Sequence, residues 1–154
     1  MKKIISIAVL CLLLSLLAGC SKETEQDKVK KVVATVQKAA EEKDIKTINN
    51  SISKAYSDPQ GNNSGSINRL LVAYFYQYPK ISVYITKLDV SVTGATARAV
   101  FEAVLTSKGA AGSAPAILPD ALGAYAFDVT LSKESDGWKA VSARWERIGD
   151  AGTR

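Results

Sequence analysis

Histidine is absent from this chain of 154 residues, and cysteine occurs only twice. The chain therefore lacks the side chain that most often acts as an acid or base at neutral pH and most often binds metal ions. Cys11 lies within an apolar N-terminal segment, and Cys20 lies at its end. The rest of the chain has no pair of thiols for a disulfide, so we expect packing alone to stabilise its fold.

The sequence motifs of common catalytic and cofactor sites are missing as well. The chain contains no Gly-x-Ser-x-Gly turn around a nucleophile, no glycine-rich phosphate loop and no cysteine spacing that suits zinc. We therefore expect neither a metal ion nor a cofactor, and the sequence alone assigns no catalytic residue.

Basic residues exceed acidic ones only mildly, 20 against 15, and the formal net charge is +5. They are scattered or alternate with acids, so no basic stripe marks a nucleic-acid surface, and we expect no nucleic-acid partner. The lysines at Lys28, Lys30 and Lys31 leave two interpretations open, contact with anionic lipid or plain solvation.

The first 20 residues have the three parts of an export signal. Lys2 and Lys3 give a positive start, residues 4–17 are almost all apolar, and the small residues Ala18 and Gly19 follow. A transmembrane anchor is an alternative, although the apolar run is short for a helix that needs about 20 residues to span a bilayer. A plain signal peptide, with Cys20 incidental, is another.

The stretch Leu17-Ala18-Gly19-Cys20 resembles the lipobox of bacterial lipoproteins. The resemblance implies cleavage between Gly19 and Cys20 and acylation of Cys20, which would anchor the protein in a membrane. Ser21 follows the cysteine, and in Gram-negative lipoproteins this pattern resembles proteins forwarded to the outer membrane. We therefore expect an outer-membrane lipoprotein that faces the periplasm. The predicted organisation is a signal peptide at 1–19, a lipidated tether at 20–26, one domain at 27–148 and a polar tail at 149–154.

Three helices are predicted in the first half of the domain. Thr24 and Asp27 have the spacing of a cap at the start of the first helix, which carries an apolar stripe at helical spacing, namely Val29, Val32, Val33, Val36 and Ala40. Asp44 is expected to cap a second, shorter helix. The third is expected from Ser66, as its N-cap, to Tyr78, where Pro79 ends it.

Apolar residues recur with a period of two from Ile81 onward, which predicts strands. The apolar phase shifts by one residue after Ile85, and this shift predicts a bulge or bend near Thr86 and Lys87. Two more strands are expected, separated by an uncharged stretch at 109–119, with Tyr125, Phe127, Val129 and Leu131 on one face of the second. A hairpin turn at 135–137 leads into the last strand, with Val141, Ala143 and Trp145 on one face.

Three helices followed by about four bent antiparallel strands indicate an α+β domain. The helix ending at Pro79, the bent strand from Ile81 and the Gly137-Trp138-Lys139 hairpin resemble the nuclear transport factor 2-like superfamily of cone-shaped domains. A cystatin-like sheet wrapped on one helix is the nearest alternative.

The helix at 66–78 is the most aromatic part of the chain, and two interpretations of it stay open. It either packs directly on the sheet or forms one wall of a pocket. In the second case we expect Tyr74, Tyr78, Tyr125 and Trp145 to line the pocket.

Three functions are compatible with these features. The first is a membrane-anchored domain that binds a small apolar ligand or an envelope protein without catalysis. The second is an isomerase-like or hydrolase-like enzyme that uses carboxylate and tyrosine groups, since members of the superfamily include such enzymes. For that case the strand acids Asp89, Glu102 and Asp128 are the candidates, although pairing across the sheet with Arg98 or Arg144 explains them equally well. The third is a structural module that forms a homodimer.

Overall fold

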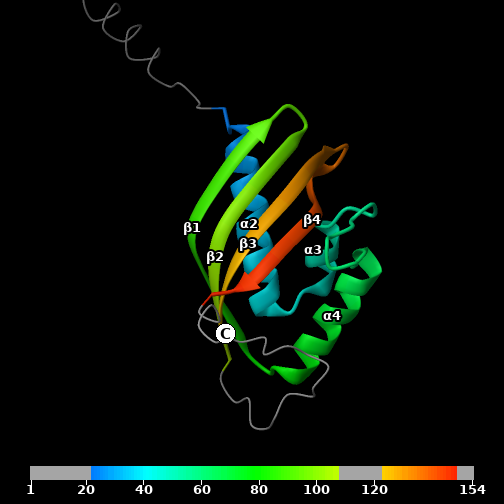
Figure 1. Ribbon diagram of the computed structural model, residues 1–154, viewed down its shortest axis with the longest axis vertical. Coiled ribbons are helices and arrows are strands. Elements are labelled where there is room, and N and C mark those ends of the chain that lie inside the picture. The colour runs from blue at the N-terminus through cyan, green and yellow to red at the C-terminus, as the bar shows by residue number, and fades with distance from the viewer. Residues whose placement is uncertain (1–21, 108–122, 149–154) are drawn as a thin grey trace, which may run out of the picture.

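The computed structural model describes residues 22–107 and 123–148 as three helices and one sheet. The helices are α2 (Glu25–Glu42), α3 (Ile45–Asn50) and α4 (Ser64–Gln77), and the strands are β1 (Ile81–Thr93), β2 (Thr96–Ser107), β3 (Gly123–Glu134) and β4 (Gly137–Arg147). The sheet is antiparallel in the order β1-β2-β3-β4. Figure 1 shows the strands curving together over α2, with α3 and α4 beyond β4. The predicted α+β class is confirmed. The predicted lipidation site at Gly19 and Cys20, the stretch at 109–119 and the tail lie outside the described residues.

Helix α2 packs closely on the inner face of the sheet. It begins with a capping box, in which the Thr24 hydroxyl accepts a hydrogen bond from the Asp27 backbone N–H and the Asp27 carboxylate accepts one from the Thr24 backbone N–H. Val29 of α2 is fully buried, and on β2 it faces the buried side chains of Ala97 and Ala99. These small side chains let the helix approach the sheet closely, and the named members of this core cluster lie between Val29 and Trp138.

The bulge predicted in β1 is confirmed. The pairing of β1 with β2 shifts its register between Thr86 and Asp89, and Lys87 adopts a left-handed backbone conformation with φ of 52°. Because one residue is left out of the ladder, Ile85 and Leu88 both face the core although they are three residues apart.

Strand β4 contains a second irregularity that the sequence pattern did not predict. Its pairing with β3 shifts between Thr130 and Leu131, so Leu131 pairs with Ala140 whereas Thr130 pairs with Ser142. Val141 is the extra residue. As a result, Trp138 faces the core on one side of the bulge, and Trp145 faces the inner side on the other.

Both edges of the sheet are partly covered by other segments. On β1, the Gln37 side chain donates a hydrogen bond to the Val83 carbonyl at 2.7 Å, and the Val83 N–H donates one to the Glu41 carboxylate at 2.9 Å. On β4, Ser53 N–H donates to the Ala140 carbonyl at 2.9 Å. These contacts occupy backbone groups that would otherwise be open to another strand.

Helix α4 begins two residues earlier than predicted. Its N-cap is Asn63, whose side chain accepts a hydrogen bond from the Ser66 N–H at 3.0 Å, so the prediction of Ser66 as the cap was wrong. Both residue types cap helices well, and the sequence offered both. Within the described residues, no helix is long and apolar enough to cross a membrane.

Candidate binding cavity

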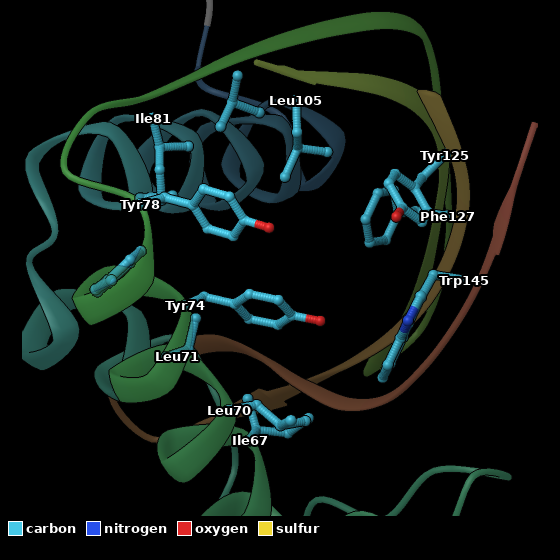
Figure 2. Close-up of a pocket in the computed structure, with 13 residues that line it drawn as sticks. Ile67, Leu70, Leu71, Tyr74, Tyr78, Ile81, Leu105, Tyr125, Phe127 and Trp145 are labelled. Carbon is cyan, nitrogen blue, oxygen red and sulfur yellow. The ribbon is translucent and has the colours of Figure 1, made fainter. Parts of the chain in front are cut away.

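A cavity of about 350 Å³ lies between α4 and the inner face of the sheet. It exists because α4 makes its close contacts with α3, whereas α2 alone among the helices packs extensively on the strands. Figure 2 shows side chains of α4 and of the sheet pointing at one another across this space. The lining residues are Ala40, Ile67, Leu70, Leu71, Tyr74, Phe75, Tyr78, Ile81, Val83, Leu105, Tyr125, Phe127 and Trp145.

The face of α4 toward the cavity is apolar but not buried. Ile67, Leu70, Leu71 and Tyr74 recur at helical spacing, the pattern of a helix that covers a core. Nevertheless, no residue of α4 is fully buried. Apolar surface left in contact with water costs roughly 25 cal/mol per Å² relative to burial, so an apolar occupant would gain free energy from this face.

Tyrosine hydroxyls are the main polar groups of the cavity. Figure 2 shows the hydroxyls of Tyr74 and Tyr78 pointing across the cavity toward the side chains of β3 and β4. The two rings are stacked, with centroids 6.4 Å apart. Burial, and to a smaller extent the neighbouring phenols of Tyr125 and Tyr78, raise the pKa of Tyr74 above its ordinary value. Tyr74 therefore stays protonated at neutral pH and can donate a hydrogen bond.

The aromatic wall opposite α4 comes from β3 and β4. Phe127 pairs with Trp145 in register, and its ring stacks on that of Phe101 with centroids 5.1 Å apart. The Tyr125 ring lies tilted beside Phe127 at 6.3 Å. This wall is flat and rigid, which suits contact with an extended apolar or aromatic molecule.

The four residues predicted to line a pocket, Tyr74, Tyr78, Tyr125 and Trp145, all lie around this one cavity. Their role in binding a ligand stays a prediction. Sequence reasoning had not named Phe127 or Leu105 as lining residues, although alternation with Tyr125 along β3 would have found the first. Leu70 and Leu71 had been placed on the apolar face of α4 without a decision between packing and pocket.

The candidate catalytic acids do not face the cavity. Asp89, Glu102 and Asp128 alternate with inward residues and lie on the outer face of the sheet. Arg98 donates two hydrogen bonds to Asp128, at 2.8 and 2.9 Å, and these lower the pKa of that carboxyl. Glu102 accepts a hydrogen bond from Lys87 at 2.9 Å. Among the residues that the structure places around the cavity, none is acidic.

One buried carboxylate does lie beside a tyrosine, but it is not among the cavity residues. Asp58 accepts hydrogen bonds from the Tyr56 hydroxyl at 3.0 Å and from the Asn62 backbone N–H at 2.8 Å. Burial opposes ionisation of Asp58, yet the hydrogen bonds from Asn62 and Tyr56 leave its pKa lowered on balance. This pair closes the loop before α4 and has the contacts of a structural carboxylate.

Metal binding finds no support in the part of the chain that the structure describes. No group of three or more His, Cys, Asp or Glu side chains there is arranged to hold a metal ion. The chemistry available to the cavity is therefore apolar contact together with hydrogen bonds from phenol and indole groups.

No protein-family model matches this chain, and no curated protein matches its sequence. Solved structures do match the described architecture. A proposed dehydratase of the nuclear transport factor 2-like family from Streptomyces avermitilis has a TM-score of 0.68 and 19% identity, over 83% of this chain and 99% of its own. A nuclear transport factor 2-like protein with a cystatin-like fold from Novosphingobium aromaticivorans has a TM-score of 0.62 and 17% identity, over 93% of this chain and 90% of its own.

The fold is a nuclear transport factor 2-like cone. The structural part of the predicted resemblance is thus confirmed, and the cystatin-like alternative describes the same architecture, as the second protein shows. A protein of Bdellovibrio bacteriovorus also matches, with a TM-score of 0.65 and 13% identity over 79% of this chain, but the chain spans only 40% of that protein's length. Identities this low show a shared fold and carry no activity over to this chain.

Proposed function

We propose that this chain is a lipoprotein of the bacterial envelope whose cone binds a small apolar ligand without transforming it. The observation that carries the proposal is the cavity between α4 and the sheet, about 350 Å³ in volume and lined by apolar and aromatic side chains. This volume lies within the range of roughly 300–1,000 Å³ that is typical of small-molecule sites. The few polar groups are hydroxyl and indole donors, which orient a ligand but supply no strong base.

The enzymatic alternative is weaker for a geometric reason. Acid–base chemistry on a ligand in the cavity needs a carboxylate within hydrogen-bond reach of it. The described acids Asp89, Glu102 and Asp128 lie on the opposite face of the sheet, and Asp58 is held by its own loop. Structural neighbours include a proposed dehydratase and a proposed aromatic ring hydroxylase, and those assignments belong to these proteins.

The membrane anchor of the proposal rests on the sequence Leu17-Ala18-Gly19-Cys20 and on the distance of this stretch from the positive start of the chain. Helix α2 begins at Glu25, only five residues after Cys20. An acylated Cys20 would therefore hold the domain close to the bilayer, where apolar molecules concentrate. A ligand drawn from the membrane or the periplasm is consistent with both parts of the proposal.

A pair of charge insertions on α4 tests the binding function. The mature chain, residues 20–154 with Cys20→Ser, is titrated with the neutral dye N-phenyl-1-naphthylamine, whose fluorescence rises in apolar sites. Leu71→Asp places a carboxylate in the cavity wall, and Val72→Asp places one on the adjacent position, which is 48% exposed. We expect saturable binding that is lost in Leu71→Asp and kept in Val72→Asp. Equal binding by both variants would contradict the cavity as the site.

A further inference from the structure

We propose that the ligand of the cavity is an amphiphile with one anionic oxygen group, such as an ionised long-chain carboxylic acid, and that Arg147 binds its charged end. This inference rests on the proposed function and specifies the chemistry of the ligand. Three observations support it: the position of Arg147, the polar groups at the same end of the sheet and the distribution of acids over the two sheet faces.

Arg147 lies on the inner face of the sheet, at the end of β4. It is two residues after Trp145, which lines the cavity, and it pairs in register with Tyr125, which lines the cavity as well. Since side chains alternate along a strand, Arg147 shares the inner face with both residues.

The guanidinium of Arg147 rests over Gly123, where β3 begins. A Cβ atom added to Gly123 would lie 3.1 Å from Arg147 Nε and 3.2 Å from Nη2, which is closer than side chains normally pack. Gly123 pairs with Leu105, another cavity residue. The glycine thus leaves room for the arginine at the end of the cavity, and its φ of +145° also favours glycine at this position.

Two polar side chains at this end of the sheet and of α4 have buried atoms without hydrogen-bond partners among the described residues. They are Ser107 Oγ and Gln77 Oε1. Ser107 is the next inward residue after Leu105 on β2, and Gln77 is the last residue of α4, three positions after Tyr74. Buried polar atoms normally have partners, so this end is suited to the polar part of a ligand, whereas the wall formed by Leu70, Leu71 and Trp145 suits the apolar part.

Charge on the sheet is divided between the faces in a way that favours an anion inside. The strand acids Asp89, Glu102, Asp128 and Glu146 alternate onto the outer face, while Arg147 lies on the inner one. An arginine presents a planar fork of donors that matches a carboxylate or a phosphate with two parallel hydrogen bonds. Next to an apolar wall such a pair is screened less than it would be in open water.

A comparison of two ligands that differ only in charge tests the proposal. The mature chain with Cys20→Ser is titrated by calorimetry with dodecanoate and with dodecanol, both below their self-association limits. In the unsubstituted cavity we expect dodecanoate to bind roughly 10- to 100-fold more tightly, as a charge-assisted hydrogen bond implies. We expect Arg147→Gln to remove this difference by weakening dodecanoate alone. Arg144→Gln, which changes an exposed arginine on the outer face, serves as the matched control and should keep the difference.

The outcomes separate this inference from the proposed function. Equal affinity for the two ligands in the unsubstituted chain, or an unchanged preference for dodecanoate in Arg147→Gln, would overturn the inference and leave apolar binding in place. Failure of both ligands to bind would overturn both. The comparison in the unsubstituted chain needs no variant, so it decides the matter even if Arg147→Gln does not fold.

Discussion

The indole N–H of Trp138 donates a hydrogen bond to the Glu25 carboxylate at 2.8 Å and so joins the start of α2 to the start of β4. Lys28 donates to the same carboxylate at 2.8 Å, and Lys133 forms an ion pair with it at 3.0 Å. Trp138 itself is buried in the core cluster. Glu25 therefore connects the first turn of the helix, the last hairpin and the core.

This network predicts a loss of stability in acid. Hydrogen bonds from Lys28, Lys133 and Trp138, in that order, lower the pKa of Glu25 from 4.5 to about 2. Because the folded pKa is the lower one, the carboxylate stabilises the fold fully above pH 4.5, and this contribution is lost as the pH falls from about 4.5 to about 2. We expect Glu25→Gln to lower the melting temperature at pH 7 and to flatten its dependence on pH across that interval, as measured by circular dichroism.

Glu23→Gln is the control for this prediction. Glu23 has only an exposed ion pair with Lys31, 3.9 Å long, and such pairs contribute little. A melting curve for Glu25→Gln that matches that of Glu23→Gln at every pH would show that the network around Glu25 does not stabilise the fold.

The alanines on the inner face of β2 are predicted to be intolerant of larger side chains. Ala99 is fully buried in the core cluster with Val29 of α2. Ala99→Leu should lower the free energy of unfolding by about 1–3 kcal/mol, the usual cost of overpacking a core. Val100→Leu, one residue away on the outer face, should change it by much less. Urea denaturation of the two variants measures the difference, and equal effects would contradict the close approach of α2.

The Arg98–Asp128 pair is predicted to be a surface contact of small energetic value. The two side chains are 62% and 33% exposed, and exposed ion pairs contribute about 1 kcal/mol at most. Asp128→Ala should therefore reduce the free energy of unfolding by no more than about this amount and leave the binding of the neutral dye unchanged. Loss of dye binding with an intact fold would place Asp128 in the functional site after all.

The lipid anchor is tested by labelling. Cells that express the full chain with a radioactive or clickable fatty acid should yield a labelled protein in the membrane fraction. The Cys20→Ser variant should carry no label and leave that fraction. A variant that is still acylated, or a native protein without fatty chains, would contradict the anchor.

Sequence patterns predicted the fold well where a side chain has one plausible orientation. The slip of apolar phase after Ile85 located the β1 bulge because Leu88 and Val90 could not otherwise reach the core. The β4 bulge was missed because Val141, Ala143 and Trp145 alternate regularly, and nothing in that pattern shows that Val141 is the extra residue. Trp138 was consequently assigned to a turn instead of the core.

The cavity could be predicted only as one of two alternatives. An apolar face on α4 is the same in sequence whether the helix packs on a sheet or stands away from it, and the separation depends on α3 and the loop before α4. Arg147 was missed because it follows the last strongly apolar residue, Trp145, and resembles the beginning of a polar tail. Its position becomes informative only when Gly123 is found beneath it.

The most direct test uses the two tryptophans of the chain as internal reporters. Trp145 lines the cavity, whereas Trp138 is buried in the core and bonded to Glu25. Titration of the mature chain with an apolar ligand such as dodecanoate should shift the tryptophan emission to a saturable end point. The shift should vanish in Trp145→Phe with the fold intact. The same saturable shift in Trp145→Phe, or no shift in the unsubstituted protein while α4 and the sheet remain folded, would contradict a ligand-binding cavity between them.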